Sequence, residues 1–198
     1  MTDILALSNW AVLSVEHGKE LIIKAEYLVQ PDCCLKCGSE HFYKHGPKTI
    51  AYRDGPVRGS PVIVQAVLKR YRCRDCGGTF IQPIDGIEPN TRMTERCVEI
   101  IQNECFTDTF VNIAKRIGCD DKTVRSIANE YVSRLNEAYE PNLSGWIGID
   151  ETKIDGKQRF VVVNVEQRRY IDMFDTRDKA AVSNWLQRNR NAHIEGFV

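Results

Sequence analysis

The sequence predicts an α+β protein made of several small modules, and three observations support this prediction. Between residues 31 and 86, short strand-like runs and Gly/Pro-rich turns surround two cysteine pairs. From about Thr91 to Tyr139 there is no proline and helical periodicity takes over. Strand-like runs followed by one helix then return after Pro141. A length of 198 residues fits one domain or two or three such modules.

The composition is that of an ordinary globular protein. Hydrophobic residues make up 42% and charged residues 27%, which argues against a disordered or collagen-like chain. The 27 basic and 27 acidic residues give no net charge, but residues 31–85 carry nine basic and five acidic ones. An anion is therefore expected near the paired cysteines. No apolar run approaches the ~20 residues that span a bilayer, and no signal peptide is recognisable, so we expect a cytoplasmic chain without a membrane partner.

Residues 1–30 predict a β-hairpin. Its strands are Trp10 to Glu16 and Leu21 to Leu28, with a turn at His17-Gly18-Lys19. In the following module, residues 31–86, the most strand-like run is Val62 to Leu68.

The cysteines of this second module predict a zinc ribbon. Cys34 and Cys37 form one C-x-x-C-G knuckle, and Cys73 and Cys76 form another. Four thiolates suit one tetrahedral zinc ion and leave no open position, so the zinc would be structural. The 35 residues between the pairs require strands extended by a hairpin.

Other interpretations of these cysteines remain open. The four thiols could be buried without a metal, whereas a redox pair is disfavoured because neither pair begins a helix. Cys33 could replace Cys34, although its spacing to Cys37 is one residue too long. His41 and His45 are expected at the surface or in a strand rather than as ligands.

Basic residues beside the second knuckle predict phosphate contacts. The candidates are Lys69, Arg70, Arg72 and Arg74. Strand alternation places Arg70, Arg72 and Arg74 on one face, and Lys69 with Tyr71 and Cys73 on the other. A solvated strand face without a ligand is the alternative.

Residues 87–140 predict a helix-turn-helix. A helix from Phe110 to Ile117 ends at Gly118-Cys119, and Asp120 or Asp121 can cap the next helix. Four residues would project from that second helix toward DNA: Lys122, Arg125, Ser126 and Asn129. The alternative is an ordinary three-helix bundle, and the acidic residues of this segment favour it. Cys97, Cys105 and Cys119 are expected to be small core residues.

Residues 141–198 predict the beginning of a ribonuclease-H-like α/β domain. Three strand-like runs cover Trp146–Asp150, Phe160–Val165 and Tyr170–Phe174. A helix from about Asp178 to Arg190 and a final run, Ile194–Val198, follow. In such folds an Asp on the first strand binds one of two divalent metals, which makes Asp150 a catalytic candidate. One Asp alone is a weak signal.

The order of these modules resembles bacterial insertion-sequence transposases of the DDE class, most closely the ISL-three family. The motifs that carry the resemblance are Cys34 to Ser39, Arg70 to Phe80 and Gly148 to Glu151. The resemblance implies cut-and-paste transposition, with the N-terminal modules bound to the double-stranded DNA of terminal inverted repeats. It implies a nucleoid-associated bacterial protein, leaves homodimer formation open, and maps the first catalytic aspartate onto Asp150.

The sequence departs from the family at two places. The family's Cys-Pro-x-Cys is Cys34-Leu-Lys-Cys37 here, which should not affect zinc binding. Ile194 to Val198 resembles the strand of the second catalytic Asp, stopped just before that residue. We therefore expect a truncated catalytic domain that cannot cut DNA alone, with Mg²⁺ or Mn²⁺ bound only in the intact enzyme.

Two rival functions remain. One is a non-catalytic zinc-ribbon and helix-turn-helix regulator that binds DNA, with a last segment that only dimerises. The other is a zinc-stabilised scaffold that binds protein, which an absence of salt-dependent DNA binding would favour.

Overall fold

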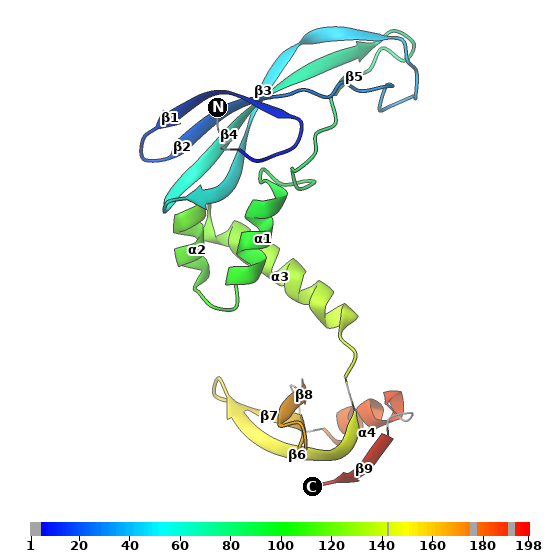
Figure 1. The fold of residues 1–198 in the computed structure, drawn as a ribbon. Coiled ribbons are helices and arrows are strands. Elements are labelled where there is room, and N and C mark those ends of the chain that lie inside the picture. Colours follow the sequence, from blue (N-terminus) through cyan, green and yellow to red (C-terminus); the bar gives the residue numbers. More distant parts are fainter. Residues whose placement is uncertain (1–4, 142, 175–177, 190–192) are drawn as a thin grey trace. The chain divides into compact units, whose positions relative to one another are not determined.

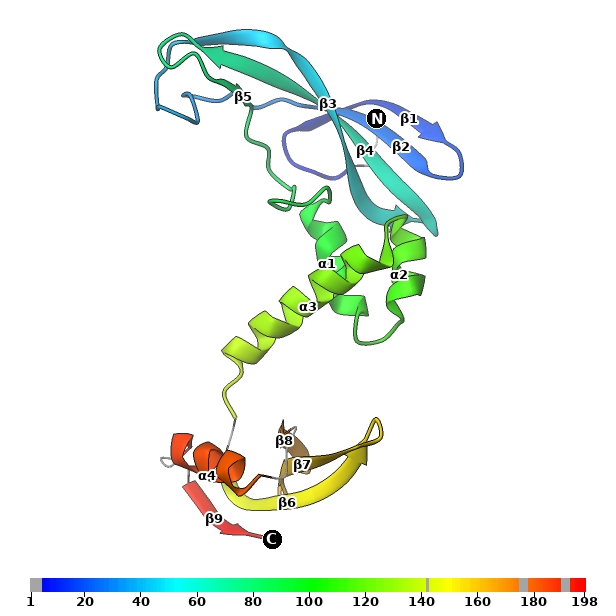
Figure 2. The ribbon, with the colours of Figure 1, turned by 180° about the vertical axis from the view of Figure 1, so that it is seen from behind.

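A computed structural model describes residues 5–141, 143–174, 178–189 and 193–198 of the chain (Figure 1; Figure 2 from behind). The chain divides into two compact units, one ending at Leu135 and the other beginning at Asn136. The division falls near the end of the third helix, a few residues before the boundary expected from Pro141.

The first unit contains one five-stranded sheet. Its strands are β1 (Trp10–His17), β2 (Leu21–Tyr27), β3 (Phe42–Val57), β4 (Ser60–Cys73) and β5 (Thr79–Ile81). The order is β1-β2-β4-β3, and β5 pairs with the far end of β4. The expected N-terminal hairpin is present, and its second strand runs parallel to β4, so hairpin and ribbon share one sheet.

Strand β4 contributes to two cores on opposite faces of this sheet. In its first half the even-numbered residues are buried, from Val62 to Leu68. In its second half the odd-numbered Tyr71 and Cys73 are buried instead. Because side chains alternate along a strand, the two sets point in opposite directions. The change lies close to the irregularity in the β3–β4 pairing between Lys44 and Pro47.

Three helices follow the sheet: α1 (Glu95–Glu104), α2 (Phe110–Ile117) and α3 (Asp121–Ala138). Helix α2 has the bounds that the sequence predicted, and Gly118 ends it in the left-handed conformation at φ 77°. The carboxylate of Asp120 accepts the peptide N–H of Lys122 at 2.8 Å, so Asp120 caps α3. Two of the three cysteines expected in the core, Cys97 and Cys119, belong to the core of this bundle or pack against it.

The turn between α2 and α3 packs closely on the sheet. A Cβ at Gly118 would lie 2.8 Å from the Arg53 guanidinium and 2.9 Å from Pro61 Cβ. Glycine is therefore needed here for two reasons: the backbone is left-handed, and there is no space for a side chain. Nearby, Arg53 Nη1 forms an ion pair with Glu20 Oε1 at 2.5 Å.

A buried carboxylate joins the first helix to the sheet. Asp54 of β3 is 1% exposed, and its Oδ1 accepts hydrogen bonds from Thr94 Oγ1 and Arg96 Nε, both at 2.7 Å. Its Oδ2 pairs with Nη2 of the same arginine. Arg96 Nη1 also donates to the carbonyl of Leu5 at 2.7 Å. Asp54 thus connects β3, the start of α1 and the N-terminal segment.

The second unit is a four-stranded sheet with one helix. Its elements are β6 (Ser144–Ile154), β7 (Lys157–Asn164), β8 (Arg169–Phe174), α4 (Lys179–Arg188) and β9 (His193–Phe197). The strand order is β8-β7-β6-β9, with β9 parallel to β6 and the other pairs antiparallel. Trp185 of α4 packs into the core and donates its indole N–H to Asp172 at 2.7 Å. Arg190, the expected end of this helix, lies outside the described residues.

In the described part of the chain, no helix is both long and apolar enough to cross a membrane.

We predict that Asp54→Ala lowers the free energy of unfolding of the first unit by about 3 kcal/mol. The substitution leaves the buried Thr94 hydroxyl and the partly exposed Arg96 guanidinium without their shared acceptor. Urea unfolding followed by circular dichroism measures the change. Asp32→Ala, at an exposed residue, is the matched control and should change the value by less than about 0.5 kcal/mol. Equal effects of the two variants would contradict the role of Asp54.

Candidate functional site

The structure brings the four paired cysteines together at the end of the β3–β4 hairpin that lies opposite its turn, where Phe42 pairs with Cys73. We call this the ribbon end. The sulfurs of Cys34, Cys37, Cys73 and Cys76 all lie within 4.8 Å of one another. Two of the sulfur–sulfur distances are 3.8 Å, between Cys34 and Cys76, and 3.7 Å, between Cys37 and Cys73. A tetrahedral ion about 2.3 Å from each sulfur would place neighbouring sulfurs about 3.8 Å apart. Both donor type and spacing therefore fit one structural zinc ion.

Each knuckle is shaped by its own backbone. Gly38 and Gly77, which follow the second cysteine of each pair, both have left-handed φ values of 74° and 67°. The peptide N–H of Gly38 donates to the carbonyl of Cys34 at 2.8 Å, which closes the first turn. The Ser39 hydroxyl donates to the Asp75 carboxylate at 2.5 Å, so the two knuckles are also joined to each other. This hydrogen bond lowers the pKa of the Asp75 carboxyl.

An aromatic cluster lies beside the four sulfurs. Tyr71 stacks on Phe80 with ring centroids 5.6 Å apart, and Phe42 contacts both rings edge-on. Together with Cys34 and Cys73 these rings form a small separate core. The zinc ligands and this core would therefore stabilise the ribbon end together.

The local electrostatics differ between two of the four thiols. The peptide N–H of Cys76 contributes most to lowering the pKa of Cys73, to about 7, against the effect of desolvation. The peptide N–H of Ser39 lowers the pKa of Cys37, but the neighbouring thiols and desolvation together raise it to about 12. Zinc binds thiolates, so an ion entering this cluster would displace the remaining protons.

The predicted phosphate-binding residues are not equivalent in the structure. Lys69 is half-buried and its amine lies 3.0 Å from Glu26 Oε1, which neutralises it. Arg70 donates from Nε to the carbonyl of His45 at 3.0 Å. Arg72 and Arg74 are exposed, and the Arg74 guanidinium lies 5.2 Å from the centre of the Tyr43 ring.

The four residues that the sequence placed on the second helix of the predicted helix-turn-helix are all exposed on α3. They are Lys122, Arg125, Ser126 and Asn129. Arg125 is partly engaged, because its guanidinium lies 5.3 Å from the Phe110 ring and 4.0 Å from Asp121. The buried side of the helix carries Val124, Ile127 and Ala128, which pack into the bundle.

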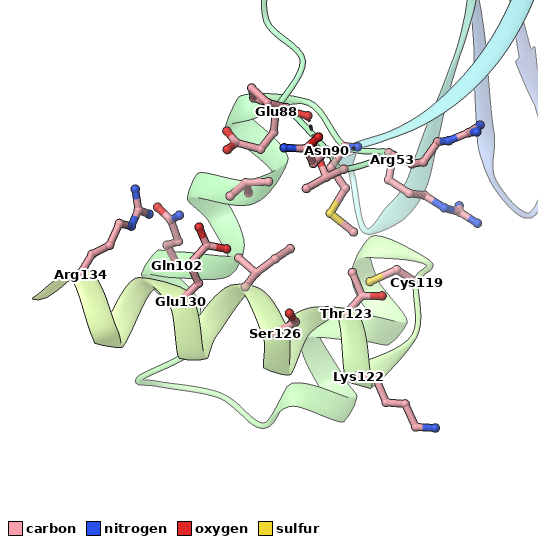
Figure 3. A pocket seen from close by; sticks show the side chains of 16 residues that line it. Arg53, Glu88, Asn90, Gln102, Cys119, Lys122, Thr123, Ser126, Glu130 and Arg134 are labelled. Carbon is pink, nitrogen blue, oxygen red and sulfur yellow. Dashed lines mark hydrogen bonds between the residues drawn. The ribbon is translucent and has the colours of Figure 1, made fainter. Parts of the chain in front are cut away.

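A cavity of about 720 Å³ borders α3, and two of the four predicted DNA-contacting residues, Lys122 and Ser126, are among the residues that line it (Figure 3). It lies between α1, α3 and the loop of residues 88–93, and Met93, Val98 and Ile127 supply apolar lining. Its charged lining has both signs: Arg53, Arg92, Lys122 and Arg134 with Glu88 and Glu130. In Figure 3 the Lys122 side chain points away from the cavity. This mixture of charges does not select an anionic ligand.

Asp150 lies on β6 with an exposed side chain. It stands opposite Val161 of β7, and its Oδ1 accepts the peptide N–H of Glu151 at 2.7 Å. Strand β9 runs on the other side of β6, where the peptide N–H of Ile149 donates to the carbonyl of Val198 at 3.2 Å. Among the described residues, the cysteine set is the one group of three or more potential ligand side chains. Asp150 is therefore not part of such a group within the described residues.

Sequence reasoning missed two features of the first unit. Asp54 and Arg96 lie 42 residues apart, and nothing in the local pattern pairs them. Tyr43 was not singled out, although it comes two residues before His45 in a strand that must pair with the arginine-rich one. Counting that strand's register back from the knuckles would have placed Tyr43 beside the arginines.

We predict one zinc ion per chain in protein purified under reducing conditions, measured by mass spectrometry of the metal. Cys76→Ser removes one sulfur from the tetrahedral set and should lower both the zinc content and the midpoint of thermal unfolding. Cys33→Ser is the matched control, because Cys33 adjoins Cys34 but lies outside the four-sulfur group. A zinc content well below one, or equal losses in the two variants, would contradict the assignment.

The comparisons with known proteins agree with the metal site. Residues 30–76 match the family model described as the zinc finger of transposase IS204/IS1001/IS1096/IS1165. Neither the curated proteins nor the solved structures contain a match to the chain. The resemblance that the cysteine motifs indicated is thus confirmed for residues 30–76: this segment, with all four cysteines, is similar to the zinc finger of those transposases.

Proposed function

We propose that the chain is the DNA-binding part of an insertion-sequence transposase, followed by part of its catalytic domain. The observation that carries this proposal is the match of residues 30–76 to a transposase zinc finger, with four sulfurs arranged for one ion. In this proposal the zinc ribbon and the α2–α3 pair bind the terminal inverted repeats of the element in double-stranded DNA.

Helix α3 is the proposed recognition helix. It follows α2 across the left-handed Gly118 turn, as the second helix of a DNA-binding helix-turn-helix does. Lys122 and Arg125 suit guanine edges or phosphates, and Asn129 suits adenine. These side chains are exposed on the side of α3 that does not enter the bundle core.

The acidic residues of this segment oppose DNA binding, and two of them are engaged in ion pairs with a neighbouring arginine. Glu104 and Asp108 both form ion pairs with Arg116, so two carboxylates share one internal partner. Lys122 and Asn129 of α3 are exposed and accessible to a ligand. An ordinary three-helix bundle is the competing interpretation, and a DNA-binding measurement separates the two.

The second unit is the proposed start of a ribonuclease-H-like domain with Asp150 as its first catalytic carboxylate. The antiparallel meander β6–β7–β8, then α4, then β9 parallel to β6, supports this interpretation. In an intact enzyme further carboxylates would join Asp150 to hold two Mg²⁺ or Mn²⁺ ions for phosphodiester cleavage and strand transfer. The described residues do not assemble such a site, so no catalytic step is assigned to them.

A non-catalytic DNA-binding regulator is the second candidate. It requires no metal-binding group at Asp150, which among the described residues belongs to no group of three or more potential ligands. The Asp150→Asn substitution in a full-length protein that performs strand transfer distinguishes the two functions. Loss of strand transfer supports the transposase, and unchanged strand transfer removes the catalytic assignment.

We predict that the chain binds duplex DNA with an affinity that falls as salt rises, and that Lys122→Gln reduces this salt dependence. One lost phosphate contact should lower the slope of log affinity against log salt by about 1. Fluorescence anisotropy with duplexes selected from a random library measures both quantities. With the selected duplex, Asn129→Ala should cost about tenfold in affinity and relax the sequence preference at one base pair.

Lys19→Gln provides the matched control, since Lys19 is exposed in the β1–β2 turn and loses the same charge. An equal drop in slope for both lysine variants would mean that α3 is not the contact surface. No salt-dependent binding to any duplex would remove the proposed function and favour a protein-binding scaffold.

We predict that the 198-residue chain does not nick supercoiled plasmid DNA in Mg²⁺ or Mn²⁺. A single exposed aspartate cannot hold two metal ions on a phosphodiester. Gel electrophoresis of the plasmid is the measurement, with Asp150→Asn run in parallel. Metal-dependent nicking that disappears in Asp150→Asn would contradict this prediction.

A further inference from the structure

One face of the sheet at the ribbon end gathers arginines around an exposed aromatic ring. In the strand register Tyr43 of β3 stands opposite Arg72 of β4, and Arg72 stands opposite Thr79 of β5. Residues paired across neighbouring strands point to the same side of a sheet. Arg70 lies two residues before Arg72 on the same side, and the Arg74 guanidinium reaches the Tyr43 ring. We call Tyr43, Arg70, Arg72 and Arg74 the Tyr43 face.

The cores of the first unit leave this face open. At the ribbon end the aromatic cluster of Phe42, Tyr71 and Phe80 lies on the opposite side of the same three strands. The larger core, which is on the side of the Tyr43 face, ends at Leu68 of β4. The zinc knuckles and the aromatic cluster therefore stiffen the strands from behind while the Tyr43 face stays in solvent.

The Tyr43 ring is exposed to solvent and is not part of a hydrophobic core. It is 40% exposed, the Arg74 guanidinium lies 5.2 Å from the centre of the ring, and the His45 ring is nearly perpendicular to it at 6.3 Å between centroids. A guanidinium over an aromatic ring makes a flat, cationic surface. Such a surface can stack with another planar group without burying a charge.

The charge of this face suits a polyanion. The paired positions of the face hold Tyr43, Arg70, Arg72, Thr79 and Ile81, and none of these is acidic. Asp75, the acid next to Arg74 in sequence, accepts a hydrogen bond from Ser39 in the other knuckle. On the opposite face, by contrast, Lys69 is neutralised by Glu26.

An exposed ring among arginines matches nucleic acid with unpaired bases. Bases inside a duplex are already stacked on each other, so a lone aromatic side chain gains little from them. Bases of a single strand can stack on the ring while the arginines contact the backbone phosphates. We propose that the Tyr43 face binds single-stranded DNA, with a base stacked on Tyr43 and phosphates on Arg72 and Arg74. This inference deepens the proposed function, because it rests on DNA being the ligand of the zinc ribbon.

The test compares two probes with the full 198-residue chain loaded with zinc. One probe is a fluorescent oligothymidylate of about 16 nucleotides, the upper site size of common single-strand-binding modules. The other is the duplex selected for α3. Tyr43→Leu should weaken binding to the oligothymidylate about tenfold or more and leave duplex binding unchanged. Tyr43→Phe keeps the ring and should bind the single strand like the original protein.

Additional variants separate charge from stacking. Arg72→Gln should reduce the salt dependence of single-strand binding, whereas Lys36→Gln, at an exposed knuckle residue outside the Tyr43 face, should reduce it less. The Tyr43 ring is in neither core, so we expect Tyr43→Leu to keep the zinc content and the midpoint of thermal unfolding of the original protein. These two measurements establish that the variant is folded.

The outcomes distinguish this inference from the proposed function. Equal single-strand affinities for Tyr43→Leu and the original protein would overturn the inference, as would a loss confined to the duplex. If duplex binding survives in Tyr43→Leu and falls in Lys122→Gln, the proposed function stands whatever the single-strand result. If no duplex binds while single-strand binding depends on Tyr43, the inference holds and the role of α3 fails.

Discussion

Strand β4 belongs to two cores that lie on opposite faces of one sheet, and the rest of the first unit is arranged around this fact. Side chains alternate between the two faces of a strand. Because β4 buries Val62 to Leu68 on one face and Tyr71 and Cys73 on the other, other residues must cover both faces. The N-terminal segment at Leu5 and the residues after β5, such as Ile84, pack into the first of these cores. The knuckles and their aromatic rings supply the other. Because the second core is small, a metal ion is the natural means of holding it together.

The helices depend on the same sheet through polar contacts rather than through a large apolar surface. Asp54 takes hydrogen bonds from the cap and the first turn of α1, and Arg96 extends the network to the N-terminal segment. Gly118 brings the α2–α3 turn against β3 and β4 without room for a side chain. These contacts orient α3 within the first unit, so the proposed recognition residues are held by the sheet that also carries the zinc site. The second unit has its own core around Ile147 and Trp185.

Two surfaces of the first unit are thus available for a nucleic acid, and they differ in chemistry. The exposed side of α3 offers polar groups that suit the edges of paired bases. The Tyr43 face offers a ring and arginines, which suit unpaired bases and phosphates. The mixed charges around the cavity between α1 and α3 give it no comparable preference.

Features that depend on neighbours in sequence could be predicted from the sequence alone. The C-x-x-C-G knuckles and the bounds of α2 are set by residues within a few positions of each other, and so is the cap of α3, for which the sequence offered Asp120 or Asp121. The parallel pairing of β2 with β4, the Asp54–Arg96 contact and the exposure of Tyr43 depend on segments far apart in the chain. Local preferences do not specify such pairings, because side-chain alternation reports that a strand has two faces without saying what covers each. Only the tertiary structure decided which of the predicted basic residues are neutralised, as Lys69 is by Glu26, and which remain in solvent beside an aromatic ring.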